Sequence, residues 1–209
     1  MTPDAALAAG LDELSLALQP LQRQQLLTYL SLIGKWNLVY NLTAIRDEVR
    51  MVSTHLLDAL AIIPHLPGKN FLDVGSGAGL PGVPVAVARP NCSVTLLDSN
   101  QKKAAFLQHA VTELELRNAT VRATRVEAWH PDERFDVIAS RAFSELADFI
   151  GKSRHLLSER GVFAAMKGTY PEAEIARLPD DFRIRAVKRL AVPGLAAERH
   201  LVLVEHATS

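Results

Sequence analysis

A glycine-rich loop that follows an apolar run, between Phe71 and Gly82, limits the possible folds of this chain more than any other feature. The apolar run is typical of a buried strand, and the loop has glycine at Gly75, Gly77, Gly79 and Gly82. Glycine lets backbone N–H groups approach a ligand where a side chain would block it. The stretch therefore predicts a strand, a loop that binds a nucleotide-type cofactor and then a helix.

An acidic residue follows the next apolar run along the chain. The run Ser93 to Leu97 ends at Asp98, about 20 residues beyond the loop, where α/β nucleotide folds place a carboxylate that accepts hydrogen bonds from ribose hydroxyls. Asp98 and the loop together predict a cofactor site more specifically than either does alone.

The loop fits two cofactors. The series Gly77, Gly79, Gly82 matches the dinucleotide pattern G-x-G-x-x-G. Asp73, however, stands inside the strand end, where its carboxylate would repel a pyrophosphate and favour a sulfonium or ammonium group. We therefore predict S-adenosylmethionine; a dinucleotide, or a loop needed only for packing with Asp73 and Asp98 as caps, remains an alternative.

Composition limits the class of protein. The 209 residues suffice for one α/β domain with a small appendage, and 23 basic residues balance 23 acidic ones, which argues against a general polyanion binder. Between Arg183 and His200 basic residues exceed acidic ones, which is suggestive of a local patch. The single Cys92, the absence of a Cys/His metal pattern and the lack of a long apolar run predict a metal-free cytoplasmic protein.

The chain divides into two predicted parts. Residues 1–66 show helical periodicity and predict an N-terminal helical cap, with Pro20 opening its second helix, and residues 67–209 predict the cofactor-binding core. In the core we expect strands over 71–75, 93–98, 119–126, 135–140, 161–167, 182–192 and 199–206. We expect helices over 81–89, 101–116, 144–157 and 171–178.

Alternating strands and helices predict an α/β fold with a mainly parallel seven-stranded sheet and ligands at the carboxyl ends of its strands. The last two strands, joined through Pro193 and Gly194, predict a C-terminal antiparallel hairpin. This layout resembles the Rossmann-like class I S-adenosylmethionine-dependent methyltransferases.

The predicted strand ends carry polar residues suited to a nucleic-acid base. The Asn/Asp-Pro-Pro-aromatic motif typical of enzymes that methylate base amines is absent, and Ser140-Arg141-Ala142-Phe143 stands in its place. Guanine N7 already has a free lone pair and needs no general base. Phe143 could stack on the base, and Arg141, Lys167 and Arg199 could hold phosphate or guanine O6.

Motifs over nearly the whole chain resemble the bacterial small-subunit ribosomal RNA guanine-N7 methyltransferases, also called the glucose-inhibited division protein B family. They are Trp36-Asn37, Asn41-Leu42-Thr43, His55 with Asp58, the loop Asp73 to Gly82, Leu96-Leu97-Asp98-Ser99, Arg125-Val126-Glu127, Ser140 to Phe143, Lys167-Gly168 and Glu198-Arg199-His200. Ala59 departs from the serine usual in that family, which puts a hydroxyl contact there in doubt.

The resemblance implies methylation of N7 of guanine 527 in 16S ribosomal RNA or the small ribosomal subunit, by a monomer. It implies cofactor contacts at Gly75, Leu80, Val126, Glu127 and Arg141, beside the residues predicted above from the loop. It also implies RNA-facing or catalytic-pocket positions at Asn41, His55, Lys167 and Arg199. The rival functions are an NAD-dependent oxidoreductase and a noncatalytic RNA-binding module.

Overall fold

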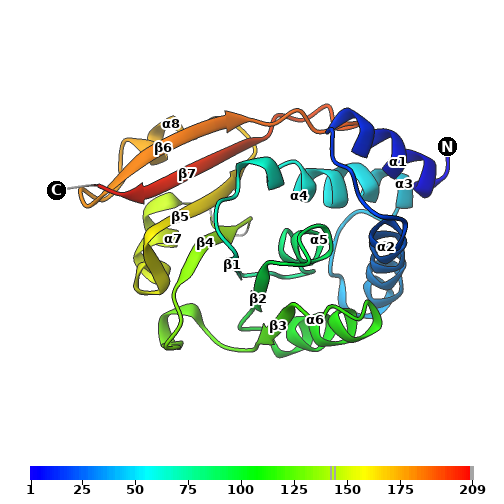
Figure 1. Cartoon of the computed structure of the whole chain (residues 1–209), viewed down its shortest axis with the longest axis horizontal. Helices are drawn as coiled ribbons and strands as arrows, with labels where there is room; N and C mark the ends of the chain where they lie inside the picture. Colours follow the sequence, from blue (N-terminus) through cyan, green and yellow to red (C-terminus); the bar gives the residue numbers. More distant parts are fainter. Residues whose placement is uncertain (142, 144, 208–209) are drawn as a thin grey trace.

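The computed structural model describes residues 1–141, 143 and 145–207. Ala142 of the predicted strand-end motif and Ser144, where a helix was predicted to begin, lie outside the described residues. The described strands form one seven-stranded sheet in the order β3-β2-β1-β4-β5-β7-β6 (Figure 1). They are β1 Asn70–Val74, β2 Ser93–Leu97, β3 Ala119–Arg122, β4 Phe135–Ser140, β5 Leu157–Lys167, β6 Phe182–Arg189 and β7 His200–His206.

The pairing confirms the predicted fold class. Strand β1 lies between β2 and β4, β3 pairs with β2, β5 pairs with β4, and all of these pairs are parallel. Strand β7 lies between β5 and β6 and is antiparallel to both. Since the carboxyl ends of parallel strands meet at one edge of a sheet, the segments that follow β1, β2, β4 and β5 gather there.

Side chains alternate between the two faces of the sheet, as the period of a strand requires. In β4, Val137 and Ala139 pack into one apolar core, and Ile138 packs into a second one on the opposite face. The first core also holds α5 Gly82–Ala88, α6 Gln101–Glu113 and the N-terminal helices; the second holds α7 Leu146–Ser153. The sheet is therefore buried on both sides.

The N-terminal helices cover the first face of the sheet. Helix α2 begins at Pro20, as predicted, and packs against α5 and α6. Between Glu48 and Leu60 the helix is divided by a π-helical stretch, η1. The elements are α1 Pro3–Glu13, α2 Pro20–Tyr40, α3 Glu48–Met51, η1 Val52–Leu57, α4 Asp58–Leu60 and the 3-10 turn η2 Ile63–His65. The division of the chain at residue 66 stays a prediction.

Several predicted bounds were wrong, for reasons that lie in strand pairing. Strand β3 ends at Arg122 rather than at 126, because its only partner β2 ends at Leu97 within the described sheet. Strand β6 ends at Arg189 rather than at 192, because its partner β7 begins at His200. Strand β5 begins at Leu157, four residues early, where it pairs with Phe135.

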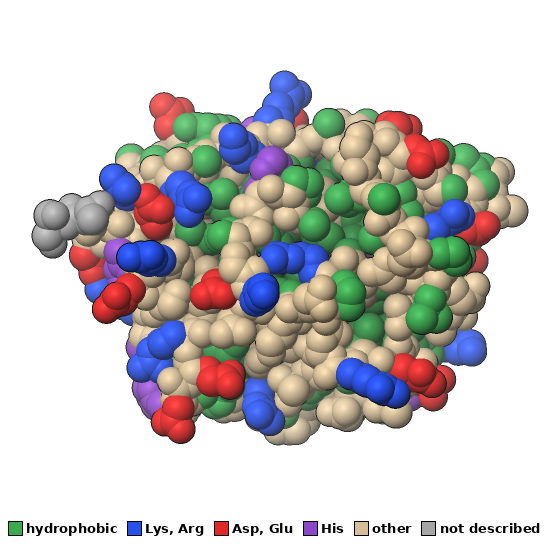
Figure 2. All heavy atoms as spheres, viewed as in Figure 1, with side chains coloured by type: hydrophobic (Ala, Val, Ile, Leu, Met, Phe, Trp, Pro, Cys, Tyr) green, Lys and Arg blue, Asp and Glu red, His purple; other side chains and the backbone are tan. Residues whose placement is uncertain are grey.

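The remaining helical elements are short. The predicted helix 144–157 gives way after α7 to a 3-10 turn, and the helix predicted over 171–178 is a single turn that follows Pro171. These elements are η3 Val126–Ala128, η4 Arg154–Leu156 and α8 Glu172–Ile175. Within the described ranges, no helix has the length and apolar character to cross a bilayer. Acidic and basic side chains are interspersed on the face that Figure 2 shows.

Candidate functional site

Three adjoining cavities lie where the parallel strands end. The first has a volume of about 200 Å³, the second about 210 Å³ and the third about 250 Å³. Gly75 lines both the first and the second cavity, and Arg141 lines both the second and the third. The three cavities therefore form one continuous site along this edge of the sheet.

Each cavity has its own set of lining residues. The first is lined by Val74, Gly75, Leu97, Asp98, Ser99, Thr124, Arg125, Val126, Glu127, Phe143 and Lys152. The second is lined by Leu42, Thr43, His55, Gly75, Ser76, Gly77, Ala78, Leu80, Lys103 and Arg141. The third is lined by Asp58, Arg141, Met166, Lys167, Gly168 and Arg199.

The glycine loop is held against β2 by hydrogen bonds. The N–H groups of Gly75 and Ser76 donate to the carbonyl of Leu97, at 2.8 and 3.1 Å. Gly75 and Gly77 have φ angles of 70° and 59°, in the left-handed region that favours glycine. The hydroxyl of Tyr29, from α2, donates to the carbonyl of Ala78 and supports the loop from the side of the helices.

Asp98 lies between the loop and the first cavity. One carboxylate oxygen accepts the N–H of Gly77 at 2.8 Å, and the other accepts the N–H of Asn100 at 2.8 Å. Both bonds fix the carboxylate at the cavity wall, directly after β2. This is where the sequence predicts a ribose contact; the contact itself stays a prediction.

Asp73 and Gly79, both predicted to contact the cofactor, are not among the residues that line the cavities. A Cβ at Gly79 would meet the side chains of Val83, Leu107 and Tyr29, so only glycine fits there. The carboxylate of Asp73 is fully buried and accepts the N–H of Gly82 at 2.9 Å. Burial raises the pKa of Asp73 to about 7. In this structure Asp73 supports the start of α5, and its approach to a cationic group stays a prediction.

The first cavity has an apolar wall and a charged rim. Val126 and Glu127 come from η3, which the shortened β3 leaves free to turn toward the cavity. The ring of Phe143 stacks on Phe149 with 5.2 Å between centroids, and the ammonium of Lys152 lies 5.6 Å from the centroid of Phe143. Phe143, predicted to contact RNA, therefore lies beside the residues predicted to contact the cofactor.

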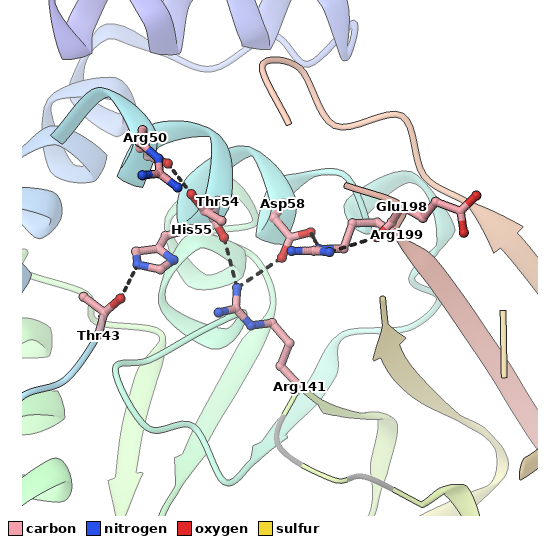
Figure 3. A network of polar contacts seen from close by, with 8 residues as sticks. All are labelled: Thr43, Arg50, Thr54, His55, Asp58, Arg141, Glu198 and Arg199. Atoms are coloured by element: carbon pink, nitrogen blue, oxygen red, sulfur yellow. Dashed lines mark hydrogen bonds and ion pairs between the residues drawn. The ribbon is translucent and has the colours of Figure 1, made fainter. Parts of the chain in front are cut away.

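An ion cluster around the buried carboxylate of Asp58 lies between the second and third cavities (Figure 3). The carboxylate of Asp58, whose side chain is 1% exposed, accepts a hydrogen bond from Nη1 of Arg141 at 3.1 Å and one from Nε of Arg199 at 3.0 Å. Arg141 follows β4, Arg199 precedes β7, and Asp58 begins α4. One carboxylate thus holds together two of the three residues predicted to be catalytic.

The π-helix places a backbone acceptor in the same cluster. In η1 the N–H of Asp58 donates to the carbonyls of Ser53 and His55 rather than to that of Thr54. The carbonyl of Thr54 accepts Nη1 of Arg141 at 3.3 Å. Single π-helical turns often occur at functional sites, because they change which groups face a neighbour.

His55, predicted to face RNA or to lie in the catalytic pocket, lines the second cavity, and its contact with RNA stays a prediction. It is buried, and its Nε2 lies 3.0 Å from the hydroxyl of Thr43. Its Nδ1 is buried without a hydrogen-bond partner among the described residues. Burial, together with the positive charge of Arg141, lowers the pKa of His55 to about 4. His55 is therefore neutral at physiological pH.

Lys167 is fixed at the far wall of the third cavity. Its ammonium donates to the carboxylate of Glu174 at 2.7 Å and to the carbonyl of Phe143 at 3.0 Å. Glu174 also accepts the N–H of Leu146, which begins α7. Lys167 therefore reaches the site as one half of a largely buried ion pair rather than as a free cation.

Two further predicted features lie outside the three cavities. Asn41 is exposed and ends α2 with a left-handed φ of 48°, so it lies on the surface beside Leu42. In the basic segment, Arg183 and Arg185 both lie near Glu205, at 2.7 and 3.6 Å. The suggested basic patch is thus largely neutralised by its neighbours.

Sequence reasoning missed the roles of several lining residues. It named Asp58 without a role, because the two arginines that it binds are 83 and 141 residues away in the chain. The other missed lining residues are Thr43, Ser99, Lys103, Thr124, Lys152 and Met166, and Glu174 was missed as the partner of Lys167. Thr43 could have been found, since it belongs to a motif quoted from the sequence.

Comparison with solved structures supports the fold. Glycopeptide N-methyltransferase MtfA, complexed with S-adenosyl-L-methionine, superposes with a TM-score of 0.64 at 13% identity, over 74% of this chain and 88% of that one. TrmN from Thermus thermophilus gives a TM-score of 0.56 at 21% identity, over 71% of this chain and 48% of that one. At such identities the likeness shows the methyltransferase fold alone.

Comparison of sequences shows the family. The family model described as "GidB: rRNA small subunit methyltransferase G" matches residues 22–202. Ribosomal RNA small subunit methyltransferase G of Laribacter hongkongensis is 56% identical over 196 residues, 94% of this chain and 95% of the relative. The protein of the same name from Chromobacterium violaceum is 54% identical over 199 residues, 95% of each chain. This chain therefore belongs to the rRNA small subunit methyltransferase G family.

Proposed function

We propose that this protein transfers a methyl group from S-adenosylmethionine to N7 of one guanine in 16S ribosomal RNA. The observation that carries the proposal is the continuous row of three cavities joined at Gly75 and Arg141. The first two cavities have room for the nucleoside and the amino-acid part of S-adenosylmethionine, and the third has room for a base.

The residues of the first two cavities suit S-adenosylmethionine. Val126 and Phe143 offer apolar surface for an adenine ring, and the carboxylate of Asp98 stands where ribose hydroxyls can donate to it. In the second cavity a Cβ on Gly77 would meet nothing nearer than the carbonyl of Gly75 at 3.8 Å, so the loop leaves open space there. When bound, S-adenosylmethionine supplies a methyl group made electrophilic by its sulfonium.

The third cavity suits an acceptor that needs no base. Asp58 is the acidic residue among its described lining residues, and its carboxylate is engaged by two guanidinium groups. It is therefore poorly placed to take a proton from an amine. Guanine N7 has an in-plane lone pair and carries no proton. Orientation of N7 in line with the methyl group would then supply much of the rate, about 7 kcal/mol or more.

Cations of the third cavity would orient the base. Arg141, Lys167 and Arg199 all line it, and we assign to them the contacts with guanine O6 or the neighbouring phosphate. Arg141 also lines the second cavity, so it lies between donor and acceptor. We further propose that the protein works as a monomer in the cytoplasm, without a metal ion.

The decisive experiment uses small ribosomal subunits from a strain that lacks this activity. Incubation with S-adenosylmethionine labelled in the methyl group should transfer label to 16S RNA, and mass spectrometry of nuclease fragments should locate it on N7 of one guanine. Label on an exocyclic amine, or on protein, would refute the acceptor assignment. An absence of transfer at saturating cofactor would favour a noncatalytic RNA-binding module.

Calorimetry distinguishes the methyltransferase from the alternative of an NAD-dependent oxidoreductase. We expect binding of S-adenosylmethionine and no binding of NAD at the same concentration. Binding of NAD and none of S-adenosylmethionine would contradict the methyltransferase proposal.

A further inference from the structure

Three consecutive large apolar residues are exposed at the end of α2, immediately before the lining of the second cavity. Leu38 is 79% exposed, Val39 70% and Tyr40 43%. Leu42 and Thr43, which follow them closely, line the cavity. Exposed apolar clusters of this kind mark interaction sites more often than isolated exposed residues do.

Helix α6 adds cations to the same surface. The ammonium of Lys102 lies 5.9 Å from the ring centroid of Tyr40, and Lys103 lines the second cavity. Helices α2 and α6 are in contact, which brings the two segments together (Figure 1). We call Leu38, Val39, Tyr40, Lys102 and Lys103 the α2–α6 surface.

Basic residues are concentrated in the two segments that form this surface, and Asp47, Asp98 and Glu113 stand just outside them. Segments 35–46 and 99–112 contain Lys35, Arg46, Lys102 and Lys103 and no Asp or Glu. The whole chain, by contrast, has equal numbers of acidic and basic residues. An aromatic ring with neighbouring cations is the combination that binds single-stranded nucleic acid, since bases stack on the ring and phosphates pair with the cations.

Tyr40 is already held in place for stacking. Its ring lies against Trp36 with 5.3 Å between centroids, and Trp36 is in turn fixed by a hydrogen bond of 2.9 Å from its Nε1 to His109 and by edge contact with Phe106. A ring that is held before binding loses little conformational entropy when a base stacks on it.

We propose that the α2–α6 surface binds an unpaired segment of the RNA next to the target guanine, with Tyr40 stacking on a base and Lys102 contacting a phosphate. The proposal rests on the proposed function and extends it from the target base to its flanking nucleotides. A surface placed at the opening of the second cavity can guide the strand toward the third.

The test compares Tyr40→Ala with Tyr40→Phe, which keeps the ring, and with Leu21→Ala, which removes another exposed apolar side chain near the opposite end of α2. For Tyr40→Ala we expect the KM for small ribosomal subunits to rise roughly tenfold, as the loss of one base stack predicts. The kcat and the Kd for S-adenosylmethionine should stay unchanged. Tyr40→Phe and Leu21→Ala should match the wild type.

A second arm identifies the partner as RNA. Fluorescence anisotropy with a labelled single-stranded oligoribonucleotide of roughly 12 nucleotides should show weaker binding by Tyr40→Ala. Lys102→Gln should reduce the slope of log affinity against log salt by about 1. Lys69→Gln should leave the slope unchanged, because Lys69 precedes the amino end of β1, far from the carboxyl ends of the strands.

Two results would overturn the proposal. An unchanged KM for Tyr40→Ala would show that the surface has no role in substrate binding. A raised KM with unchanged oligoribonucleotide affinity would mean that the surface binds a ribosomal protein instead. The proposed function itself is judged by whether the wild-type enzyme labels the subunits, so the two proposals fail separately.

Discussion

The carboxylate of Asp58, from the N-terminal helices, accepts a hydrogen bond of 3.1 Å from Nη1 of Arg141, which follows a strand of the sheet. The same carboxylate accepts a hydrogen bond of 3.0 Å from Nε of Arg199, which also lines the third cavity. Asp58 lines the third cavity, but both of its carboxylate oxygens are engaged by these two guanidinium groups, so we regard it as a positioning residue. Its charge holds two guanidinium groups where the acceptor base would lie.

Replacement of Asp58 by Asn should disturb both arginines. It leaves two half-buried cations without their counter-charge, and we expect unfolding free energy to fall by about 3 kcal/mol. In the folded variant, kcat should fall by about 100-fold through misplacement of the arginines. Denaturant unfolding and single-turnover methylation, both at low temperature, measure the two effects.

A matched control is Glu205→Gln, which removes the partner of Arg183 in a more exposed ion pair. We expect this variant to lose less than about 1 kcal/mol and to keep its activity. Equal losses in both variants would show that Asp58 has no special role.

Arg141→Ala tests the residue that the second and third cavities share. We expect kcat/KM to fall by an amount equivalent to about 2 kcal/mol or more, because a charged contact within the site is lost. Steady-state kinetics with S-adenosylmethionine and with ribosomal subunits varied in turn give the measurement. Kinetics indistinguishable from those of the wild type would refute the assignment, and Arg183→Ala controls for loss of an exposed arginine.

Gly77→Ala tests the loop. At a φ of 59° an alanine is strained by roughly 1 kcal/mol, and its methyl group would occupy space at the second cavity. We expect the Kd for S-adenosylmethionine to rise by about tenfold, equivalent to 1.4 kcal/mol. Gly34→Ala is the control: nothing lies within 4 Å of its added Cβ inside α2, so it should stabilise the protein by about 0.5 to 1 kcal/mol without changing the Kd. A Kd unchanged in Gly77→Ala would place the methyl donor elsewhere.

His55 and Asp73 should give opposite dependences of stability on pH. Burial lowers the pKa of His55 from 6.5 to about 4, so the unfolded chain binds the extra proton between these values and stability rises with pH. Burial raises the pKa of Asp73 from 3.8 to about 7, so the folded chain holds the extra proton and stability falls as pH rises. In the wild type the two effects oppose each other.

Single variants separate these effects. From pH 5 to pH 7, unfolding free energy should rise by about 2 kcal/mol more in Asp73→Asn than in the wild type, and by about 2 kcal/mol less in His55→Gln. Urea unfolding at several pH values measures the slopes. Slopes equal to that of the wild type would mean that neither group titrates as its burial implies.

Local patterns in the sequence predicted the sheet, the loop and Asp98, because each depends on neighbours within a few residues. Strand ends were predicted less well: β3 and β6 end where a partner strand ends, and pairing is not visible in one segment alone. The residue types of Val52–Leu57 do not distinguish a π-helix from an α-helix, so the π-helix could not be predicted. The cluster of Asp58, Arg141 and Arg199 joins three separate elements, so its contacts could be identified only from the three-dimensional structure.

The position of Arg141 and Arg199 beside the third cavity has a consequence for turnover. Methylation at N7 leaves the guanine with a positive charge that it did not carry on arrival. The guanidinium groups that attract the neutral base and its phosphate would then repel the product. The same pair of side chains that admits the substrate would thereby help to expel the modified nucleotide once the reaction is complete.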